Sequence, residues 1–368
     1  MSLTGLAVAS AFGRGTAPLL SAVLSGQPAF GPVSRFDVGA RRVTVAATMA
    51  DSPGLCDELI GAVDEACADA GLTAAQRRDC PLLLAVHGDA AIGRAPARER
   101  AGHTGAALAT TVADKCGLGP QRRAYTSACV AASTAVADAA AMIRHGRADR
   151  VVVAAGYLVE PDQFALFDAG RALAADGAVR PFSAGRTGLL LGDGIAAVVL
   201  SSAASAAGTR IRCGIAGWAR TSDGYHVVQP SPEGTGMARA AGTALDRAGV
   251  AADELDYVNA HGSGTAQSDA AEAAALRSAL GAAAGRVPVS STKSVHGQAL
   301  EASSLLELIV TALAMQAGQL PVNAGFLAPD EDCPLNLVLT PARANVRYAL
   351  SLNAAFGGAN TALVLEAP

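Results

Sequence analysis

Apolar residues in this 368-residue chain fall into short β-branched runs and longer alanine-rich runs. Residues 150–156 combine three valines with alanine before a glycine, which predicts a buried strand. Residues 1–10 predict a first strand of similar character. The alanine-rich run 131–144 predicts a helix, because Gly146 supplies a stop signal just after it. Alternating strands and helices of this kind indicate an α/β protein.

The run at residues 300–315 is the most apolar helical segment, although it contains Glu301 and Glu307. It is shorter than the roughly 20 apolar residues that a membrane span needs. We therefore expect a buried core helix and no membrane partner.

Two segments of the chain resemble each other. Residues 66–88 and 244–262 each contain a helical pattern, a glycine turn, a short polar linker and a strand ending in His-Gly. The offset is nearly the same at the glycine turns and at the His-Gly pairs, close to half the chain. This repetition predicts two βαβ-type halves, each with its own sheet, over residues 1–204 and 205–368.

Composition narrows the possible functions. The net charge is −4 with no basic run, and aromatic residues make up only 4% of the chain, which argues against nucleic acid as a partner. The first ten residues lack the charged region and cleavage pattern of a signal peptide. Seven cysteines are scattered without CxxC pairs, so neither a metal site nor a disulfide framework is expected. We expect a cytoplasmic protein.

Cys129 is the first candidate for chemistry. It lies among small residues in the stretch 125–134 and directly precedes the predicted helix. Unpaired amide groups and the helix dipole favour a thiolate at such a position. A buried cysteine can equally be a small hydrophobic residue. The local sequence therefore leaves both interpretations open.

His261 is the second candidate, at the end of a predicted strand and followed by a Gly/Ser/Thr turn. An imidazole there can donate a hydrogen bond to an oxyanion or relay a proton. Ser263 and Thr265 place hydroxyl groups beside it. The alternative is a helix-capping turn with a satisfied histidine.

A third cluster lies in residues 291–301, where Lys293, His296 and Gln298 surround another strand-to-helix turn. Lys293 is a suitable partner for Glu307, because a buried carboxylate without a counter-charge is costly. Finally, residues 353–360 form a glycine turn between two apolar runs. Its amides can face an oxyanion, although a plain hairpin turn would look the same.

Taken together, these motifs resemble the β-ketoacyl synthase (condensing enzyme) family of the thiolase fold. The matching segments are Thr-Ser-Ala-Cys at 126–129, the Gly-rich strand entry at 188–194, His-Gly-Ser-Gly-Thr at 261–265, Lys293-Ser294 with Gly297, and Phe-Gly-Gly-Ala-Asn at 356–360. They occur in the family's order over nearly the whole chain. The resemblance implies a layered αβαβα architecture with two pseudo-repeated halves.

The resemblance also implies roles for these residues. Cys129 would take an acyl group from an acyl carrier protein, and the amides of Cys129 and Phe356 would form the oxyanion hole. His261 would be one of two histidines that hold the thioester carbonyl of a malonyl group. Ser263 and Thr265 would line the phosphopantetheine channel, and Lys293 and Glu307 would form a structural ion pair. No cofactor would be bound, since phosphopantetheine arrives on the carrier protein.

Gln298 departs from the family pattern, because it stands where the second histidine is expected. Glutamine can donate an N–H to an enolate oxygen but carries no positive charge. Replacing a charge-assisted bond with a neutral one costs roughly 1 to 2 kcal/mol, or about one decade in rate. His296 could swing in as a substitute or point elsewhere. Glu301, Ser303 and Ser304 also stand where small residues usually follow.

Three functions remain open at this stage. The first is decarboxylative Claisen condensation with a malonyl-type extender in polyketide or fatty-acid-like biosynthesis. The second is acyl transfer to an alcohol, amine or thiol without decarboxylation. The third is a non-catalytic partner resembling a chain-length factor, against which the presence of Cys129 and His261 argues.

Partner surfaces follow from the same resemblance. We expect a homodimer, or a heterodimer with a ketosynthase-like subunit, through pairing of residues 151–155. Five arginines supply positive charge for an acidic carrier protein, or else belong to solvated loops: Arg94, Arg98, Arg100, Arg122 and Arg123.

Overall fold

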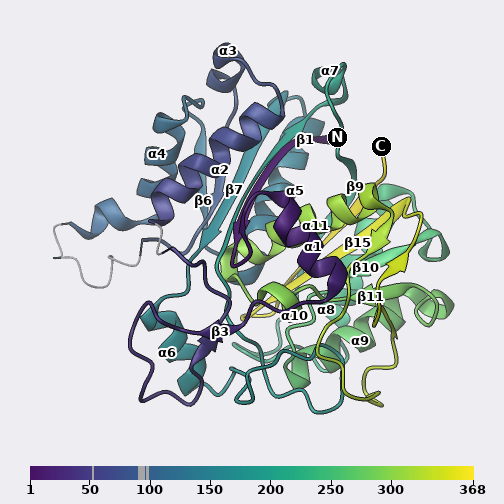
Figure 1. The fold of residues 1–368 in the computed structure, drawn as a ribbon. Coiled ribbons are helices and arrows are strands. Elements are labelled where there is room, and N and C mark those ends of the chain that lie inside the picture. Colours follow the sequence, from purple (N-terminus) through teal and green to yellow (C-terminus); the bar gives the residue numbers. More distant parts are fainter. Residues whose placement is uncertain (52–53, 90–95, 97–98) are drawn as a thin grey trace.

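The computed structural model describes residues 1–51, 54–89, 96 and 99–368, and its main feature is one large mixed sheet with helices on both faces (Figure 1). Its twelve strands are β1 (Ser2–Ser10), β2 (Gly13–Arg14), β5 (Leu82–Ala85), β6 (Arg122–Tyr125), β7 (Arg150–Tyr157), β8 (Gly194–Ser201), β9 (Cys213–Ser222), β10 (Tyr257–Asn259), β11 (Pro288–Ser290), β13 (Asn336–Leu337), β15 (Tyr348–Ala355) and β16 (Ala359–Glu366). Two short ribbons pair β3 (Gly31–Pro32) with β4 (Val45–Ala46), and β12 (Gln319–Leu320) with β14 (Ala342–Arg343).

The helices divide into long ones that cover the sheet and short ones that form turns. The α-helices are α1 (Thr16–Ser25), α2 (Leu55–Asp69), α3 (Ala74–Arg78), α4 (Gly105–Lys115), α5 (Ala131–Arg144), α6 (Pro161–Ala169), α7 (Ala203–Ala206), α8 (Thr235–Ala248), α9 (Ala266–Leu280), α10 (Lys293–His296) and α11 (Ser303–Ala317). Single 3₁₀ turns are η2 (Arg100–His103), η3 (Ala128–Val130), η4 (Ala252–Glu254), η5 (Gly281–Ala283) and η6 (Leu300–Ala302).

The strand order separates the two halves of the chain. β1, β8, β7, β5 and β6 are neighbours at one end, and β9, β16, β15, β10, β11 and β13 follow at the other. The expectation of two separate sheets is wrong, because two residue pairs between β1 and β9 join them: Ser2 with Gly214, and Leu3 with Cys213. This contact is short, so each half keeps its own run of long pairings.

Alternation along the strands produces the layers. In β7, Val151, Val153 and Ala155 face a core shared with α5 and α11, whereas Val152 and Ala154 face α2 and α4. In the second half, α8 and α9 cover the opposite face of β10, β15 and β16. Helices α5 and α11 therefore lie between the two parts of the sheet (Figure 1). This is the predicted αβαβα architecture.

Most predicted elements occur where the sequence placed them. Helix α5 has the predicted bounds, and β1 and β7 agree with prediction to within one residue. The predicted seam between residues 204 and 205 falls inside α7, which connects β8 of the first half to β9 of the second. The division into two domains stays a prediction.

The apolar segment near residue 300 is longer than predicted. It comprises η6 and α11, and residues 300–317 would be long and apolar enough to cross a membrane by length and composition alone. Within the folded chain, 89% of this segment is buried. It is the core helix that the sequence predicted.

The predicted dimer strand, by contrast, lies inside the sheet. Strand β7 is paired with β8 on one side and with β5 on the other, so residues 151–155 have no free edge for a partner chain. The prediction of pairing through this strand is wrong. Within the described residues, β6 forms the outer edge of this half. The oligomeric state itself stays a prediction.

Candidate active site

Cys129 is the middle residue of turn η3, between strand β6 and helix α5. The turn begins with Ala128 at a φ of 51°, a left-handed conformation that is unfavourable for a residue with a Cβ atom. This sharp reversal places Cys129 just before the first turn of α5, as the sequence predicted. Its side chain lies in the core, with 8% of the residue exposed.

The backbone of Gln298 is held against the Gly-rich segment 188–194. Its N–H donates to the carbonyl of Leu190 (2.8 Å), and its carbonyl accepts from the N–H of Gly192 (3.0 Å). Gly297 precedes it at a φ of 78°, where a Cβ atom would lie only 2.9 Å from the carbonyl oxygen of Leu191. Glycine is therefore required at position 297 for the chain to approach this segment.

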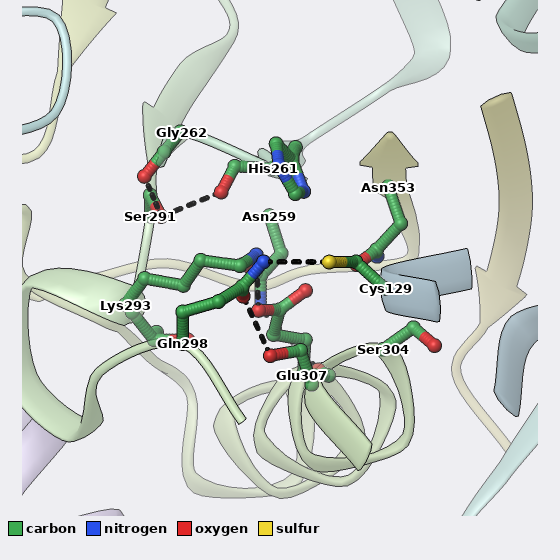
Figure 2. Close-up of polar contacts among 12 residues, drawn as sticks. Cys129, Asn259, His261, Gly262, Ser291, Lys293, Gln298, Ser304, Glu307 and Asn353 are labelled. Atoms are coloured by element: carbon green, nitrogen blue, oxygen red, sulfur yellow. Dashed lines mark hydrogen bonds and ion pairs between the residues drawn. The ribbon is translucent and has the colours of Figure 1, made fainter. Parts of the chain in front are cut away.

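The Gln298 side chain points at the sulfur of Cys129 (Figure 2). Its Nε2 donates to Cys129 Sγ at 3.0 Å, and its Oε1 accepts from the hydroxyl of Ser303 at 2.7 Å. The Ser303 oxygen in turn accepts from the N–H of Ala299 at 2.8 Å, so its own proton is free for the glutamine. With Ser303 donating to Oε1, the amide presents its NH₂ group to the sulfur.

The predicted thiolate at Cys129 is not what this environment favours. Burial raises the pKa of the Cys129 thiol to about 12, and the negative charge of Glu301 adds to the rise. The charge of Lys293 acts in the opposite direction without compensating. Loss of solvent therefore raises the pKa of Cys129 more than the helix N-terminus lowers it, and the resting group is a neutral thiol.

His261 follows β10, in a turn that is clamped by a buried carboxylate. The N–H groups of His261 and Gly262 both donate to Glu272 of α9 at 2.7 Å. The hydroxyl of Ser291 donates to the carbonyl of Gly262 at 2.8 Å. No pattern in the sequence singled out Glu272, since only folding brings it under this turn.

The imidazole of His261 is buried and neutral. Burial lowers its pKa well below the usual value, and the charge of Lys293 lowers it further. An interaction with the side chain of Asn353 opposes both effects, although no described residue makes a hydrogen bond to Nδ1 within 3.5 Å. Figure 2 draws His261, Gln298 and Asn353 in the same site as Cys129. The imidazole therefore keeps hydrogen-bonding capacity for a ligand.

Lys293 and Glu307 form the ion pair that the sequence predicted, beneath the site (Figure 2). Both side chains are essentially fully buried. Burial raises the pKa of Glu307, while Lys293 opposes the rise. Neighbouring Asn259 donates to the hydroxyl of Thr311 at 2.9 Å, on the next turn of the same helix.

Both ring nitrogens of His296 have local partners. Its Nδ1 lies 2.8 Å from the carbonyl of Gly297, and its Nε2 lies 2.9 Å from the hydroxyl of Thr292. Burial lowers the pKa of His296 to about 3, so the ring is neutral. These contacts favour the alternative that His296 points elsewhere, and its auxiliary role stays a prediction.

The contacts of the remaining predicted residues demonstrate no role in the site. Ser263 and Thr265 hydrogen-bond to each other at 2.9 Å. Phe356 sits in the turn between β15 and β16, and its half-exposed ring stacks on Phe167 at 5.9 Å. The channel and oxyanion-hole assignments stay predictions.

The predicted arginine surface is only partly described. Arg94 and Arg98 lie outside the described residues. Arg122 forms an ion pair with Asp114 (2.6 Å), and Arg123 forms one with Asp138 (3.3 Å). These two charges are partly satisfied within the chain, and a carrier-binding role for the arginines stays a prediction.

Two polar residues near the site were not proposed as functional from the sequence. Glu301 was noted as an exception in the apolar run and in the family pattern, yet its charge also acts on the Cys129 thiol. Its ion-pair partner His87 ends the first of the two repeated His-Gly segments. The repeated His-Gly segment was the one sequence signal that could have identified His87. It places His87 in the first half at the position that His261 occupies in the second half.

Neither of the two surface hollows described for this structure reaches Cys129. One is lined by residues including Met1, Arg144 and Trp218, and the other by residues including Arg14 and Glu58.

Comparisons with known proteins agree with this geometry. Residues 57–206 match the N-terminal domain of β-ketoacyl synthase, and residues 212–327 match its C-terminal domain. The ketoacyl synthase alpha subunit of tetracenomycin polyketide synthase from Streptomyces glaucescens is 34% identical, over 100% of this chain and 96% of that protein. Nodulation protein E from Rhizobium meliloti is 38% identical, over 71% of this chain and 65% of that protein.

Solved structures give the same result. The ishigamide ketosynthase/chain length factor superposes with a TM-score of 0.93 and 28% identity, over 100% of this chain and 98% of that one. A type II polyketide ketosynthase in complex with its acyl carrier protein gives a TM-score of 0.93 and 25% identity, again over 100% and 98%. From its sequence, its fold and the arrangement of its motifs, this chain belongs to the β-ketoacyl synthase family.

Proposed function

We propose that this protein accepts an acyl group from an acyl carrier protein onto Cys129 and extends it by decarboxylative condensation with a malonyl-type unit, in polyketide or fatty-acid-like biosynthesis. The observation that carries this proposal is the hydrogen bond from Gln298 Nε2 to Cys129 Sγ, beside the neutral imidazole of His261. A nucleophile and two hydrogen-bonding groups at one point are what acyl transfer and enolate stabilisation need.

In the first step, the Cys129 sulfur attacks the carbonyl carbon of the carrier-bound thioester. A new S–C bond forms, the bond to the phosphopantetheine sulfur breaks, and the thiol proton leaves with that sulfur. The amides of Cys129 and Phe356 are the proposed oxyanion donors. Because the thiol has a raised pKa, proton transfer must accompany attack.

In the second step, the malonyl group loses carbon dioxide and its α-carbon attacks the acyl carbon on Cys129. Electrons from the broken C–C bond pass to the thioester oxygen as an enolate before the new C–C bond forms. As that bond forms, the bond between the acyl carbon and Cys129 Sγ breaks, and the extended chain remains on the carrier thioester. The released sulfur takes up a proton from solvent and returns to the thiol. His261 and Gln298 are placed to donate hydrogen bonds to the enolate oxygen. Once the sulfur is acylated it is a poor acceptor, which frees the Gln298 N–H for the extender unit.

A second candidate is acyl transfer from Cys129 to an alcohol, amine or thiol without decarboxylation. The neutral amide of Gln298 favours it, since an ester or amide product needs no enolate stabilisation. A third candidate is a non-catalytic partner subunit, because one of the similar solved structures contains a chain length factor.

Two measurements separate these functions. The protein is incubated with an acyl-loaded carrier protein, and its intact mass is recorded. Carbon dioxide release is then measured from a malonyl-loaded carrier. An adduct with carbon dioxide release supports condensation, an adduct without it supports the transferase, and no adduct contradicts both.

The proposal implies a carrier protein as partner, with phosphopantetheine supplied by that carrier and no bound cofactor. Assembly as a homodimer or a ketosynthase-like heterodimer is part of the same proposal. Sedimentation of the purified chain, alone and with a candidate partner subunit, tests it.

A further inference from the structure

Turn η6 in the second half repeats the backbone of turn η3 in the first. Each is a three-residue 3₁₀ turn that begins with a residue at positive φ, Ala128 at 51° and Leu300 at 39°. Each leads directly into a central helix, α5 or α11. The middle residues are Cys129 and Glu301, and their separation in the chain is close to the offset of the His-Gly repeat. Glu301 therefore occupies the position in its half that Cys129 occupies in the other.

The Glu301 carboxylate is buried and only half satisfied. Its side chain is 4% exposed, and Oε1 lies 3.5 Å from Nδ1 of His87. Its Oε2 has no hydrogen-bond partner among the described residues. A buried carboxylate oxygen without a partner is costly, so this atom is a strong acceptor for a bound group.

A second unsatisfied group lies on the neighbouring strand. Tyr157 ends β7, which packs against η6, and its buried hydroxyl has no partner among the described residues. Burial raises the pKa of Tyr157 well above its usual value, and the charges of Asp193 and Glu301 add to the rise. The phenol is therefore un-ionised and lies within the electrostatic reach of Glu301.

Turns η3 and η6 pack directly against each other, which brings Cys129 and Glu301 into one neighbourhood. We propose that Glu301 and Tyr157 bind a hydrogen-bond donor, a hydroxyl or an amine, on the acyl group that Cys129 carries. The inference rests on the proposed acylation of Cys129. A plain alkyl chain would leave both polar groups unsatisfied, whereas a hydroxyl or amino substituent near the thioester would pair with them.

The test compares three thioesters of one chain length: butanoyl, 3-hydroxybutanoyl and 3-aminobutanoyl on the same carrier protein. The rate of adduct formation on Cys129 is followed by intact mass. We expect the two substituted groups to acylate the wild type about 10- to 100-fold faster than butanoyl, the range for satisfying a buried polar group.

Four variants locate the effect. Glu301→Ala should erase the preference, and Tyr157→Phe should reduce it. Glu301→Gln keeps one acceptor oxygen, so it should retain the hydroxyl preference and lose most of the amine preference. Tyr348→Phe is the matched control, because that hydroxyl contacts Glu366 at the far end of β15 and β16. It should leave the preference unchanged.

Equal rates for all three thioesters in the wild type would overturn the inference while leaving the proposed function standing. The inference would also be overturned if Glu301→Gln kept the full preference for the amino-substituted thioester and Tyr157→Phe kept the full preference for both substituted thioesters. These two conservative variants decide the question if Glu301→Ala does not fold. The absence of every adduct would overturn the proposed function and this inference together.

Discussion

Turns η3 and η6 share a backbone and differ in chemistry. At η3, the sulfur of Cys129 accepts a hydrogen bond from Gln298, which belongs to the other half of the chain. At η6, the carboxylate of Glu301 meets His87, which again comes from the opposite half. The repeated fold thus supplies two equivalent positions at the start of the two central helices. The side chain placed there, and the polar neighbour that crosses from the other half, decide what each position does.

The largest expected difference between the turns is in acylation. Cys129→Ala should abolish the acyl adduct, because no nucleophile remains, whereas Glu301→Ala should still form it with at least one acyl donor. Intact mass after incubation with acyl-loaded carrier measures both. An adduct that survives in Cys129→Ala would assign acylation to a different residue.

We expect the free energy of unfolding to depend more on the ion pair beneath the turns than on either turn residue. Lys293→Met should lower the free energy of unfolding by about 3 to 5 kcal/mol, because Glu307 is left buried without its counter-charge. Adding Glu307→Leu to that variant should restore much of the loss. Denaturant unfolding of the single and double variants checks this, and additive losses would contradict it.

The partner residue at η3 should limit decarboxylation. Gln298→His should raise carbon dioxide release from malonyl carrier by up to about tenfold, since an imidazole N–H is a stronger hydrogen-bond donor to an enolate oxygen than an amide N–H. Ser303→Ala is the companion variant, because it leaves Gln298 in place and removes the bond that orients its amide, together with the bond from the Ala299 N–H to the hydroxyl. It should slow release modestly. A fall in Gln298→His would show that the amide is the better group at this site.

The negative charge of Glu301 in η6 should change the reactivity of the Cys129 thiol in η3. Alkylation by iodoacetamide needs the thiolate, so with a pKa of about 12 the rate at Cys129 should rise about tenfold per pH unit from pH 7 to 10 without a plateau. Burial is the main cause of the high pKa, and Glu301 adds to it. Glu301→Gln removes that negative charge, lowers the pKa and should speed alkylation a few-fold. A plateau near pH 8 would contradict the assigned pKa.

The smallest expected effect concerns the backbone of the two turns. Ala128→Gly should stabilise the protein by up to about 1 kcal/mol, because glycine adopts the positive φ at that position without strain. Leu300→Gly should destabilise it instead, since the buried leucine side chain is lost. Thermal unfolding of both variants measures the contrast.

Local patterns were enough to predict the individual elements. The bounds of α5 followed from an alanine-rich run with a glycine stop, and the Lys293–Glu307 pair followed from the cost of a lone buried charge. The pairing of β1 with β9 that joins the sheet could not be predicted, because two residue pairs produce no recognisable pattern in the sequence of either strand. The internal position of β7 was missed for a related reason. A strand's neighbours depend on topology, and its own residues only report that it is buried.

The sequence predicted which residues form the site but not their protonation states. Motif spacing identified Cys129, His261 and Gln298, but it could not show how completely folding removes them from water. Burial reverses the expected thiolate at Cys129 and holds His261 neutral. The position of Glu301 was equally hidden, because it depends on a turn that repeats one in the first half of the chain with a different side chain.

The most direct test of this account is a peptide-level map of acylation. The protein is reacted with an acyl-loaded carrier protein, digested, and each of its seven cysteines is examined by mass spectrometry. We predict one acyl group, on the peptide that contains Cys129. An unmodified Cys129 beside a still-loaded carrier, or an acyl group on any other cysteine, would contradict the proposed chemistry.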